Sequence, residues 1–185
     1  MTPIKLLMCI YSLLIKHETI YDKVILDIIS KLRKGLYKMT IRNFQLEDKQ
    51  AFISMCNDFY NCGATLEPIK SEQMEQTFQY IIEDNSYVKG FIFEQNGEVA
   101  GYGLVFLYYS NEVGGLCGFL DEIYISPTFR GEGLGGNYLK DISSVLGEDI
   151  KGLRLEVCHT NKRAIKLYEE MGFTSLDYKQ MVKIF

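Results

Sequence analysis

The sequence predicts a single α+β domain: one mixed β-sheet with helices on both faces. Three observations lead to this prediction. Asn96-Gly97, between two runs of β-branched and aromatic residues, indicates a tight hairpin, because both turn positions need positive φ. Two strand–loop–helix units follow it. The 185 residues, 47% of them apolar, suffice for one continuous core but not for a second full domain.

The spacing of apolar residues assigns each element in turn. Apolar residues at every second position, or in an uninterrupted run, predict strands. Apolar residues that recur at positions i, i+3 and i+4 predict helices. The expected elements are a strand opening at 39, helices at 44–59 and 74–82, strands at 87–93, 99–109 and 117–125, a helix at 134–146, a strand at 153–157, a helix at 164–171 and a closing strand at 179–185. The order is therefore β-α-α-β-β-β-α-β-α-β, with Gly172 as the C-cap of the last helix.

Charge and cysteine content argue against several classes of protein. A net charge of −4 gives no broad reason to expect a nucleic-acid partner. The five cysteines are an odd number without CxxC spacing, and only two histidines could join them, so neither a disulfide framework nor a metal site is expected. Thiols scattered in this way are typical of the reducing cytoplasm, which is the expected location.

Residues 1–38 differ in character from the rest and are expected to form an N-terminal helical extension. The apolar run at 4–15 is shorter than the roughly 20 residues that span a bilayer, so no stable membrane insertion is expected. Apolar residues from Tyr21 to Leu36 recur at helical spacing. This helix is expected to pack on the domain or on a second subunit; a basic helix on a membrane surface is the alternative. Met39 is an alternative native start.

The string RGEGLGG, Arg130–Gly136, is the most informative local feature. It joins a strand to a helix, where free backbone amides and the helix dipole favour an anion. The same glycines satisfy GxGxxG, with Glu156 about 20 residues further on, as a dinucleotide-binding Rossmann unit requires. An antiparallel hairpin precedes the loop and only about 50 residues follow it, which argues against that alternative. A P-loop is excluded because no Lys-Ser or Lys-Thr follows the last glycine.

The stretch LDEIYISPTFRGEGLGGNYL closely resembles the acyl-CoA motif of the GNAT N-acetyltransferases, with Arg130, Gly133 and Gly135 at the motif positions. LRLEVCHTNKRAIKLYEEMGF resembles the second half of the same fold, so the resemblance covers nearly all of residues 39–185 and none of 1–38. It implies the GNAT fold with splayed central strands, acetyl-CoA as co-substrate, direct transfer in a ternary complex and no metal. The cofactor-binding residues that it implies are Ile123, Tyr124, Ile125, Arg130, Gly131, Glu132, Gly133, Leu134, Gly135, Gly136, Asn161 and Tyr168.

The catalytic groups follow from what the reaction needs. An amine attacks only when neutral, so a carboxylate base is useful, and the departing thiolate needs a proton, which a phenol can supply. Asp121 and Glu122 are adjacent on one strand and should face opposite sides. The resemblance favours Asp121 as base, with Glu156 as runner-up, and gives Tyr168 the role of acid. Tyr60, Cys62 and Tyr109 are expected to border the acceptor pocket.

The leading functional hypothesis is therefore an N-acetyltransferase for a primary amine of a small molecule or a protein. An acyl-CoA-binding regulatory module without chemistry is the second, and a nucleotide-binding oxidoreductase is the third. A carboxylate in a site of this kind is about as often structurally paired as catalytic, so the base assignment stays open between Asp121 and Glu156. No motif in the sequence identifies the acceptor. None identifies the oligomeric state either, for which a homodimer is one option.

Overall fold

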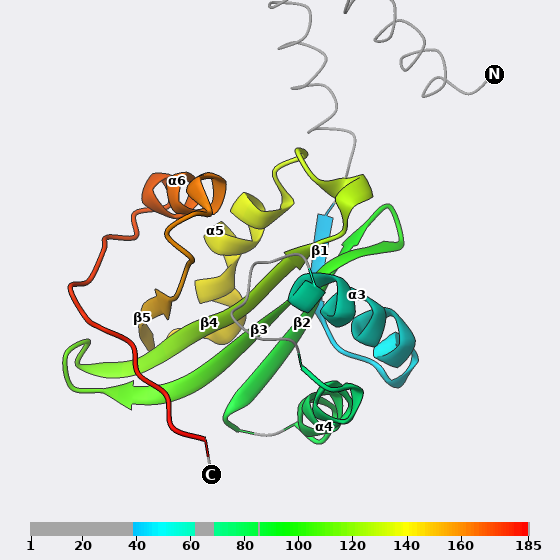
Figure 1. Ribbon diagram of the computed structural model, residues 1–185, viewed down its shortest axis with the longest axis horizontal. Coiled ribbons are helices and arrows are strands. Elements are labelled where there is room, and N and C mark those ends of the chain that lie inside the picture. Colours follow the sequence, from blue (N-terminus) through cyan, green and yellow to red (C-terminus); the bar gives the residue numbers. More distant parts are fainter. Residues whose placement is uncertain (1–38, 62–68, 85, 185) are drawn as a thin grey trace, which may run out of the picture. The chain divides into compact units, whose positions relative to one another are not determined.

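The computed structural model describes residues 39–61, 69–84 and 86–184, and the expectations for residues 1–38 and for Cys62 lie outside this range. The described strands form one sheet in the order β1-β2-β3-β4-β5, with antiparallel pairs except for the parallel β4–β5 pair (Figure 1). The strands are β1 (Met39–Asn43), β2 (Val88–Gln95), β3 (Glu98–Ser110), β4 (Gly115–Ile125) and β5 (Ile150–Leu155). The helices are α3 (Lys49–Asn61), α4 (Ser71–Ile82), α5 (Leu134–Leu146) and α6 (Lys162–Glu170), with short 3-10 turns at Leu46–Asp48 and Pro127–Phe129.

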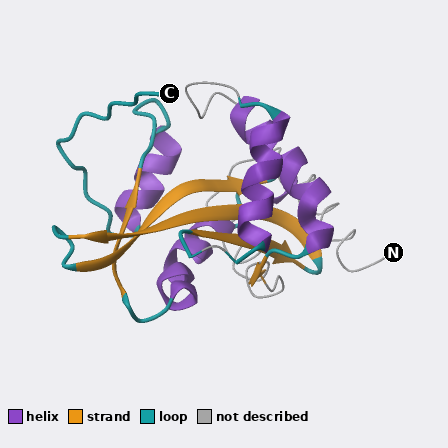
Figure 2. Ribbon diagram, turned by 90° about the horizontal axis from the view of Figure 1, so that it is seen from below, coloured by secondary structure: helices purple, strands orange, loops and turns teal. Residues whose placement is uncertain are grey.

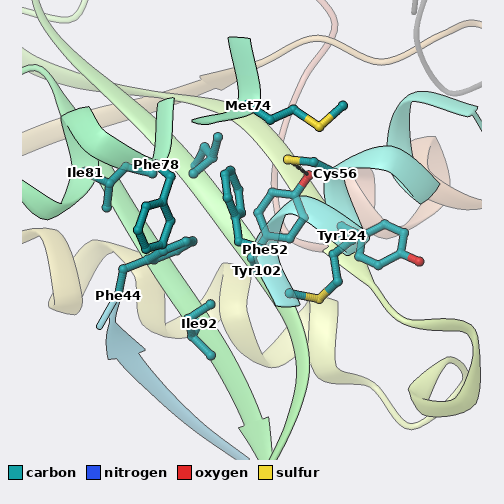
Figure 3. Packing of buried hydrophobic residues seen from close by; sticks show 11 residues of the cluster. Phe44, Phe52, Cys56, Met74, Phe78, Ile81, Ile92, Tyr102 and Tyr124 are labelled. Atoms are coloured by element: carbon teal, nitrogen blue, oxygen red, sulfur yellow. Dashed lines mark hydrogen bonds between the residues drawn. The ribbon is translucent and has the colours of Figure 1, made fainter. Parts of the chain in front are cut away.

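Helices cover both faces of this sheet, as the sequence predicted (Figure 2). On one face, α3 and α4 enclose an aromatic core in which the Phe44 ring lies 5.2 Å from Phe52 and 6.0 Å from Phe78, centroid to centroid (Figure 3). On the other face, Tyr138 and Ile142 of α5 pack on Phe93 and Val105. Because alternate residues of β2 point to opposite faces, Ile92 enters the first core and Phe93 the second.

The β2–β3 hairpin confirms the turn that the sequence predicted. Asn96 has φ 55° and Gly97 has φ 82°, so both central positions are left-handed, and Gln95 pairs with Glu98 across the turn. This turn fixes the register of the hairpin and therefore the face on which each of its side chains lies.

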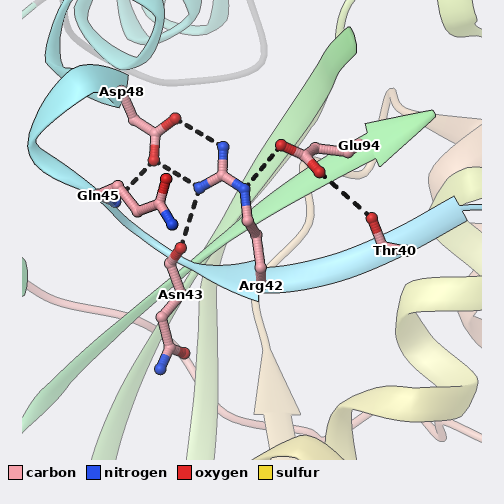
Figure 4. Close-up of polar contacts among 6 residues, drawn as sticks. All are labelled: Thr40, Arg42, Asn43, Gln45, Asp48 and Glu94. Carbon is pink, nitrogen blue, oxygen red and sulfur yellow. Dashed lines mark hydrogen bonds and ion pairs between the residues drawn. The ribbon is translucent and has the colours of Figure 1, made fainter. Parts of the chain in front are cut away.

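A partly buried ion cluster fastens β1 to its neighbours (Figure 4). The Arg42 guanidinium donates to both carboxylate oxygens of Asp48, at 2.6 and 2.8 Å, and to Glu94 of β2 at 2.7 Å. Burial of the Asp48 carboxyl opposes ionisation, but the hydrogen bonds from Arg42 and from the Gln45 amide outweigh it and lower the pKa of Asp48. The cluster joins the first strand, the second strand and the turn before α3.

Three sequence predictions differ from the structure. The strand expected at 153–157 is observed as Ile150–Leu155, so that Glu156 lies beyond its end. The first helix was expected from Phe44, but α3 begins at Lys49, because Phe44 turns into the core and a 3-10 turn capped by Asp48 intervenes. The closing strand expected at 179–185 is wrong for the described residues, since 174–184 pair with no strand. This segment instead reaches the β3–β4 turn, where the Tyr178 hydroxyl donates to Glu112 at 2.8 Å, and Leu176, Met181 and Val182 stay 57–87% exposed.

Candidate active site

The parallel strands β4 and β5 separate halfway along β4. They pair from Leu116↔Ile150 to Leu120↔Leu155, whereas β4 continues to Ile125 with β3 alone as its partner among the described strands. The β5-facing backbone edge of residues 121–125 is therefore left for another partner. This is the splay that the resemblance implied for the central strands.

The glycine loop lies directly beyond the free end of β4. Gly131 has φ 86° and Gly133, the N-cap of α5, has φ 84°, both in the left-handed region that favours glycine. A Cβ on Gly136 would lie 3.5 Å from Leu167 of α6, an ordinary contact, so packing does not demand glycine there. The bare backbone at the start of α5 fits close approach by an anionic group such as a diphosphate.

Arg130 fastens this loop to β4. Its Nε donates to the carbonyl oxygen of Ile125 at 2.8 Å, and its guanidinium carbon lies 5.6 Å from the centroid of the Tyr124 ring. These two contacts bind the first residue of the loop to the last residues of β4. Because of the hydrogen bond, the Ile125 carbonyl oxygen already has a donor from within the protein.

Asp121 is the residue at which β4 leaves β5. The register with β3 steps from Leu104↔Glu122 to Val105↔Leu120, so Asp121 is the extra residue of a β-bulge. Its side chain reaches solvent, yet surrounding protein removes enough water from the carboxylate, with help from the charges of Glu122 and Glu156, to raise the pKa of Asp121 to about 6. A carboxylate of this kind can take up a proton near neutral pH.

Glu122 lies on the α3 side of the sheet and is only 6% exposed, whereas Leu120, before the bulge, packs in the α5-side core. Its carboxylate accepts hydrogen bonds from the Tyr102 hydroxyl at 2.5 Å and the Tyr60 hydroxyl at 2.7 Å, with the Cys56 sulfur 3.9 Å away. Burial raises the pKa of Glu122, and the hydrogen bonds from Tyr102, Tyr60 and Cys56 counteract this rise. Glu122 is thus a satisfied carboxylate under α3, on the side of the sheet away from α5.

The predicted second base directly follows β5 and the predicted acid lies on α6, so both come from the chain beyond the point where β4 and β5 separate, which we call the opening. Glu156 follows the last residue of β5 and is exposed, close enough to Asp121 for its charge to raise that pKa. Tyr168 on α6 packs edge-on against Phe173, with centroids 5.9 Å apart, and burial raises the pKa of Tyr168. Its hydroxyl therefore keeps its proton at neutral pH.

The remaining predicted residues have mixed positions. The Asn161 Oδ1 accepts from the Ala164 amide at 3.2 Å as the N-cap of α6, which leaves its amide nitrogen for a ligand. Tyr60 reaches the Glu122 carboxylate beside the opening. Tyr109 does not, because it pairs with Leu116 at the other end of β4.

Sequence reasoning missed two contributors to this region. Tyr102 holds Glu122, and Gln95 at the end of β2 donates from Nε2 to the Glu132 carboxylate of the glycine loop at 2.6 Å. The available signal for Gln95 was its position: it follows Phe91 and Phe93 in the inward alternation of β2, where a polar residue is out of pattern.

Two further features concern only the part of the chain that the structure describes. It contains no group of three or more His, Cys, Asp or Glu side chains arranged to hold a metal ion. None of its helices combines the length and the apolar character needed to cross a membrane.

A glycine-rich strand–loop–helix unit beside two splayed strands is the arrangement that the resemblance to the GNAT acetyltransferases implied. The chain belongs to the GNAT acetyltransferase family, whose family model matches residues 50–173. It is similar to a thialysine N-epsilon-acetyltransferase of Bos taurus, 39% identical over 79 residues, or 42% of this chain and 46% of that protein. It spans about half the length of the thialysine acetyltransferases that it matches. The uncharacterized N-acetyltransferase YhfO of Bacillus subtilis is 27% identical over 73% of this chain and 89% of its own length.

Solved structures share the fold at low sequence identity. An aminoglycoside N-acetyltransferase, AAC(6')-Iy, crystallised with a bisubstrate analogue of coenzyme A, superposes with a TM-score of 0.66 at 14% identity, covering 80% of this chain and 99% of that one. A ribosomal-protein-alanine N-acetyltransferase from Brucella melitensis has a TM-score of 0.63 at 18% identity, covering 80% of this chain and all of that one. These likenesses establish the GNAT fold.

Proposed function

We propose that residues 39–185 form an acetyl-CoA-dependent N-acetyltransferase domain that acetylates a primary amine by direct attack in a ternary complex. The amides from Gly131 to Gly136 hold the diphosphate of the co-substrate, and the free edge of β4 at Ile123 and Tyr124 meets its pantetheine arm. The Asn161 amide nitrogen donates to the same arm from the start of α6. This binding mode is supported by the left-handed glycines and by the separation of β4 from β5.

The observation that carries the proposal is the position and acidity of Asp121. It lies where the two strands part, and its pKa of about 6 suits a base that works near neutral pH. A structural carboxylate would be expected to have paired hydrogen-bond donors, as Glu122 has. Asp121 instead combines access to solvent with a raised pKa, which is typical of functional acids and bases.

Proton transfers follow from these positions. Asp121, directly or through a water, takes the proton of the substrate ammonium, and the neutral nitrogen forms the new C–N bond at the acetyl carbonyl carbon as the C–S bond breaks. Tyr168 gives its phenolic proton to the leaving thiolate, and the acylated nitrogen loses its second proton to the resulting phenolate, directly or through water, so that the products are a neutral amide and the CoA thiol. Glu156 is the alternative base; its exposed position beside Asp121 allows either role.

For the acceptor we propose a cationic primary amine, of a small molecule or of a protein. Two carboxylates, Asp121 and Glu156, lie near the opening and would favour a positively charged substrate. Curated relatives are named for thialysine and for a ribosomal-protein alanine, and a structural relative is named for aminoglycosides. The free thiols of Cys56 and Cys117 agree with the cytoplasm as the proposed location.

A two-stage experiment tests this proposal. Thermal-shift measurements on the full chain with acetyl-CoA, CoA and NAD should show stabilisation by the first two only. Free-thiol release is then followed with thialysine, lysine, an aminoglycoside and a peptide with an N-terminal alanine as acceptors. Binding of acetyl-CoA without thiol release for any amine would favour the regulatory module, and stabilisation by NAD alone would favour the nucleotide-binding alternative.

A further inference from the structure

A carboxylate stands inside the loop that is proposed to bind a diphosphate. Glu132 lies between Gly131 and Gly133, whose left-handed backbones shape the anion site. Like charges this close repel each other, so a freely rotating Glu132 would weaken the binding of a diphosphate at the neighbouring amides. The loop therefore needs a means of directing this side chain away from the ligand.

Gln95 supplies that means in the structure. It is the last residue of β2 and only 4% exposed, and its Nε2 donates to the Glu132 Oε2 at 2.6 Å. A donor this close to an ionised oxygen forms one of the stronger kinds of protein hydrogen bond. The adjacent Asn96-Gly97 turn and the buried Phe93 ring of the same strand hold the Gln95 backbone in place.

A second observation indicates that the Gln95–Glu132 hydrogen bond has a specific role, unlike an incidental contact between two surface side chains. The Gln95 Oε1 is buried and has no hydrogen-bond partner among the described residues. A buried unsatisfied amide oxygen costs stability, and Met or Leu would fill the same space without that cost. The hydrogen bond from the amide nitrogen to Glu132 therefore explains why position 95 carries a glutamine and not an apolar residue.

We infer that Gln95 is a positioning residue for coenzyme A binding, which fastens the Glu132 carboxylate to the end of β2 and so keeps the Gly131–Gly133 amides open for the diphosphate. This inference rests on the proposed function of the loop. It makes the affinity for coenzyme A depend jointly on residues 95 and 132, although they are far apart in the sequence.

The test exchanges donor and acceptor. In Gln95→Glu two carboxylates face each other, which drives Glu132 toward the ligand, and the dissociation constant for CoA should rise about tenfold. Glu132→Gln keeps an acceptor oxygen for Gln95 and removes the charge, so CoA should bind about threefold more tightly. The double variant Gln95→Glu/Glu132→Gln restores the bond in reverse and should recover most of the tenfold loss. Isothermal titration of the full chain with CoA measures all four proteins.

Matched controls isolate the contact from general charge effects. Asn96→Asp adds the same charge one residue away, at an exposed left-handed position that Asp tolerates, and should leave the CoA affinity unchanged. If the buried carboxylate of Gln95→Glu prevents folding, Gln95→Met gives the same test. Gln95→Met should weaken CoA binding when Glu132 is present, but it should have little effect when combined with Glu132→Gln, because no charge then needs to be held.

The results distinguish the inference from the function beneath it. Equal losses from Gln95→Glu, or from Gln95→Met, with and without Glu132→Gln would overturn the positioning role while leaving coenzyme A binding intact. A folded wild-type chain that gives no heat with CoA would overturn both. Non-additive losses with recovery in the exchanged pair would establish the role of Gln95.

Discussion

Removal of the Asp121 carboxylate tests the proposed chemistry most directly. With a pKa of about 6, Asp121 is mostly ionised at pH 7 and mostly protonated at pH 5. If it is the base, kcat/KM in the wild type should fall about tenfold per pH unit below pH 6. Asp121→Asn should lower kcat/KM at pH 7.5 by about 100-fold to 10,000-fold, the usual contribution of a general base.

Glu156→Gln provides the matched comparison. The Glu156 charge is one of the causes that raise the pKa of Asp121, after burial and Glu122. Its removal should move the acidic limb of the pH profile down by on the order of half a pH unit and change the plateau rate little. Initial rates of thiol release between pH 5 and 9 measure both quantities. A plateau lowered 100-fold by Glu156→Gln, with Asp121→Asn near wild type, would transfer the base role to Glu156.

Asp121→Asn should lower activity but raise the stability of the folded protein. The folded-state pKa of Asp121, about 6, lies above its ordinary 3.8, so the folded state carries a penalty that is absent below pH 3.8 and complete above pH 6. Asp121→Asn removes this penalty. With allowance for screening by solvent, it should stabilise the protein by about 1 kcal/mol at pH 8, or about 2–4 °C in Tm, and by nothing at pH 3.5. A lower Tm at pH 8 would show that the carboxylate is not desolvated as described.

Three further substitutions probe the acid, the loop and the buried carboxylate. Tyr168→Phe should lower kcat by about 100-fold with little change in acetyl-CoA affinity, and an unchanged kcat would remove Tyr168 from the acid role. Gly133→Ala should cost about 1–2 kcal/mol in thermal unfolding, because φ is 84° there, and should also weaken CoA binding in titration; a neutral effect on both would contradict the loop geometry. Tyr102→Phe removes the 2.5 Å hydrogen bond to buried Glu122 and should lower the free energy of unfolding in urea by about 1–3 kcal/mol; a loss below half of that would place Glu122 in contact with water.

The sequence alone determined the features that depend on neighbouring residues. The left-handed turn at Asn96-Gly97, the glycine loop entering α5 and the glycine that ends α6, Gly172 with φ 88° directly after the C-cap Met171, were all predictable, because glycine and asparagine adopt such backbones at little cost wherever they occur. The order of strands and helices followed from hydrophobic periodicity. The closing strand is absent from the described residues, because an apolar tail indicates a strand without indicating an edge for it to pair with.

The tertiary structure decided which polar side chains meet. Alternation predicted opposite faces for Asp121 and Glu122, but only the bulge in the β3–β4 register and the tyrosines beneath Glu122 made one carboxylate accessible and the other buried. Likewise, Gln95 and Glu132 are 37 positions apart, and nothing local to either residue indicates their contact. Such pairs depend on strand register and on the packing of helices against the sheet, which arise from the whole chain and not from any one segment.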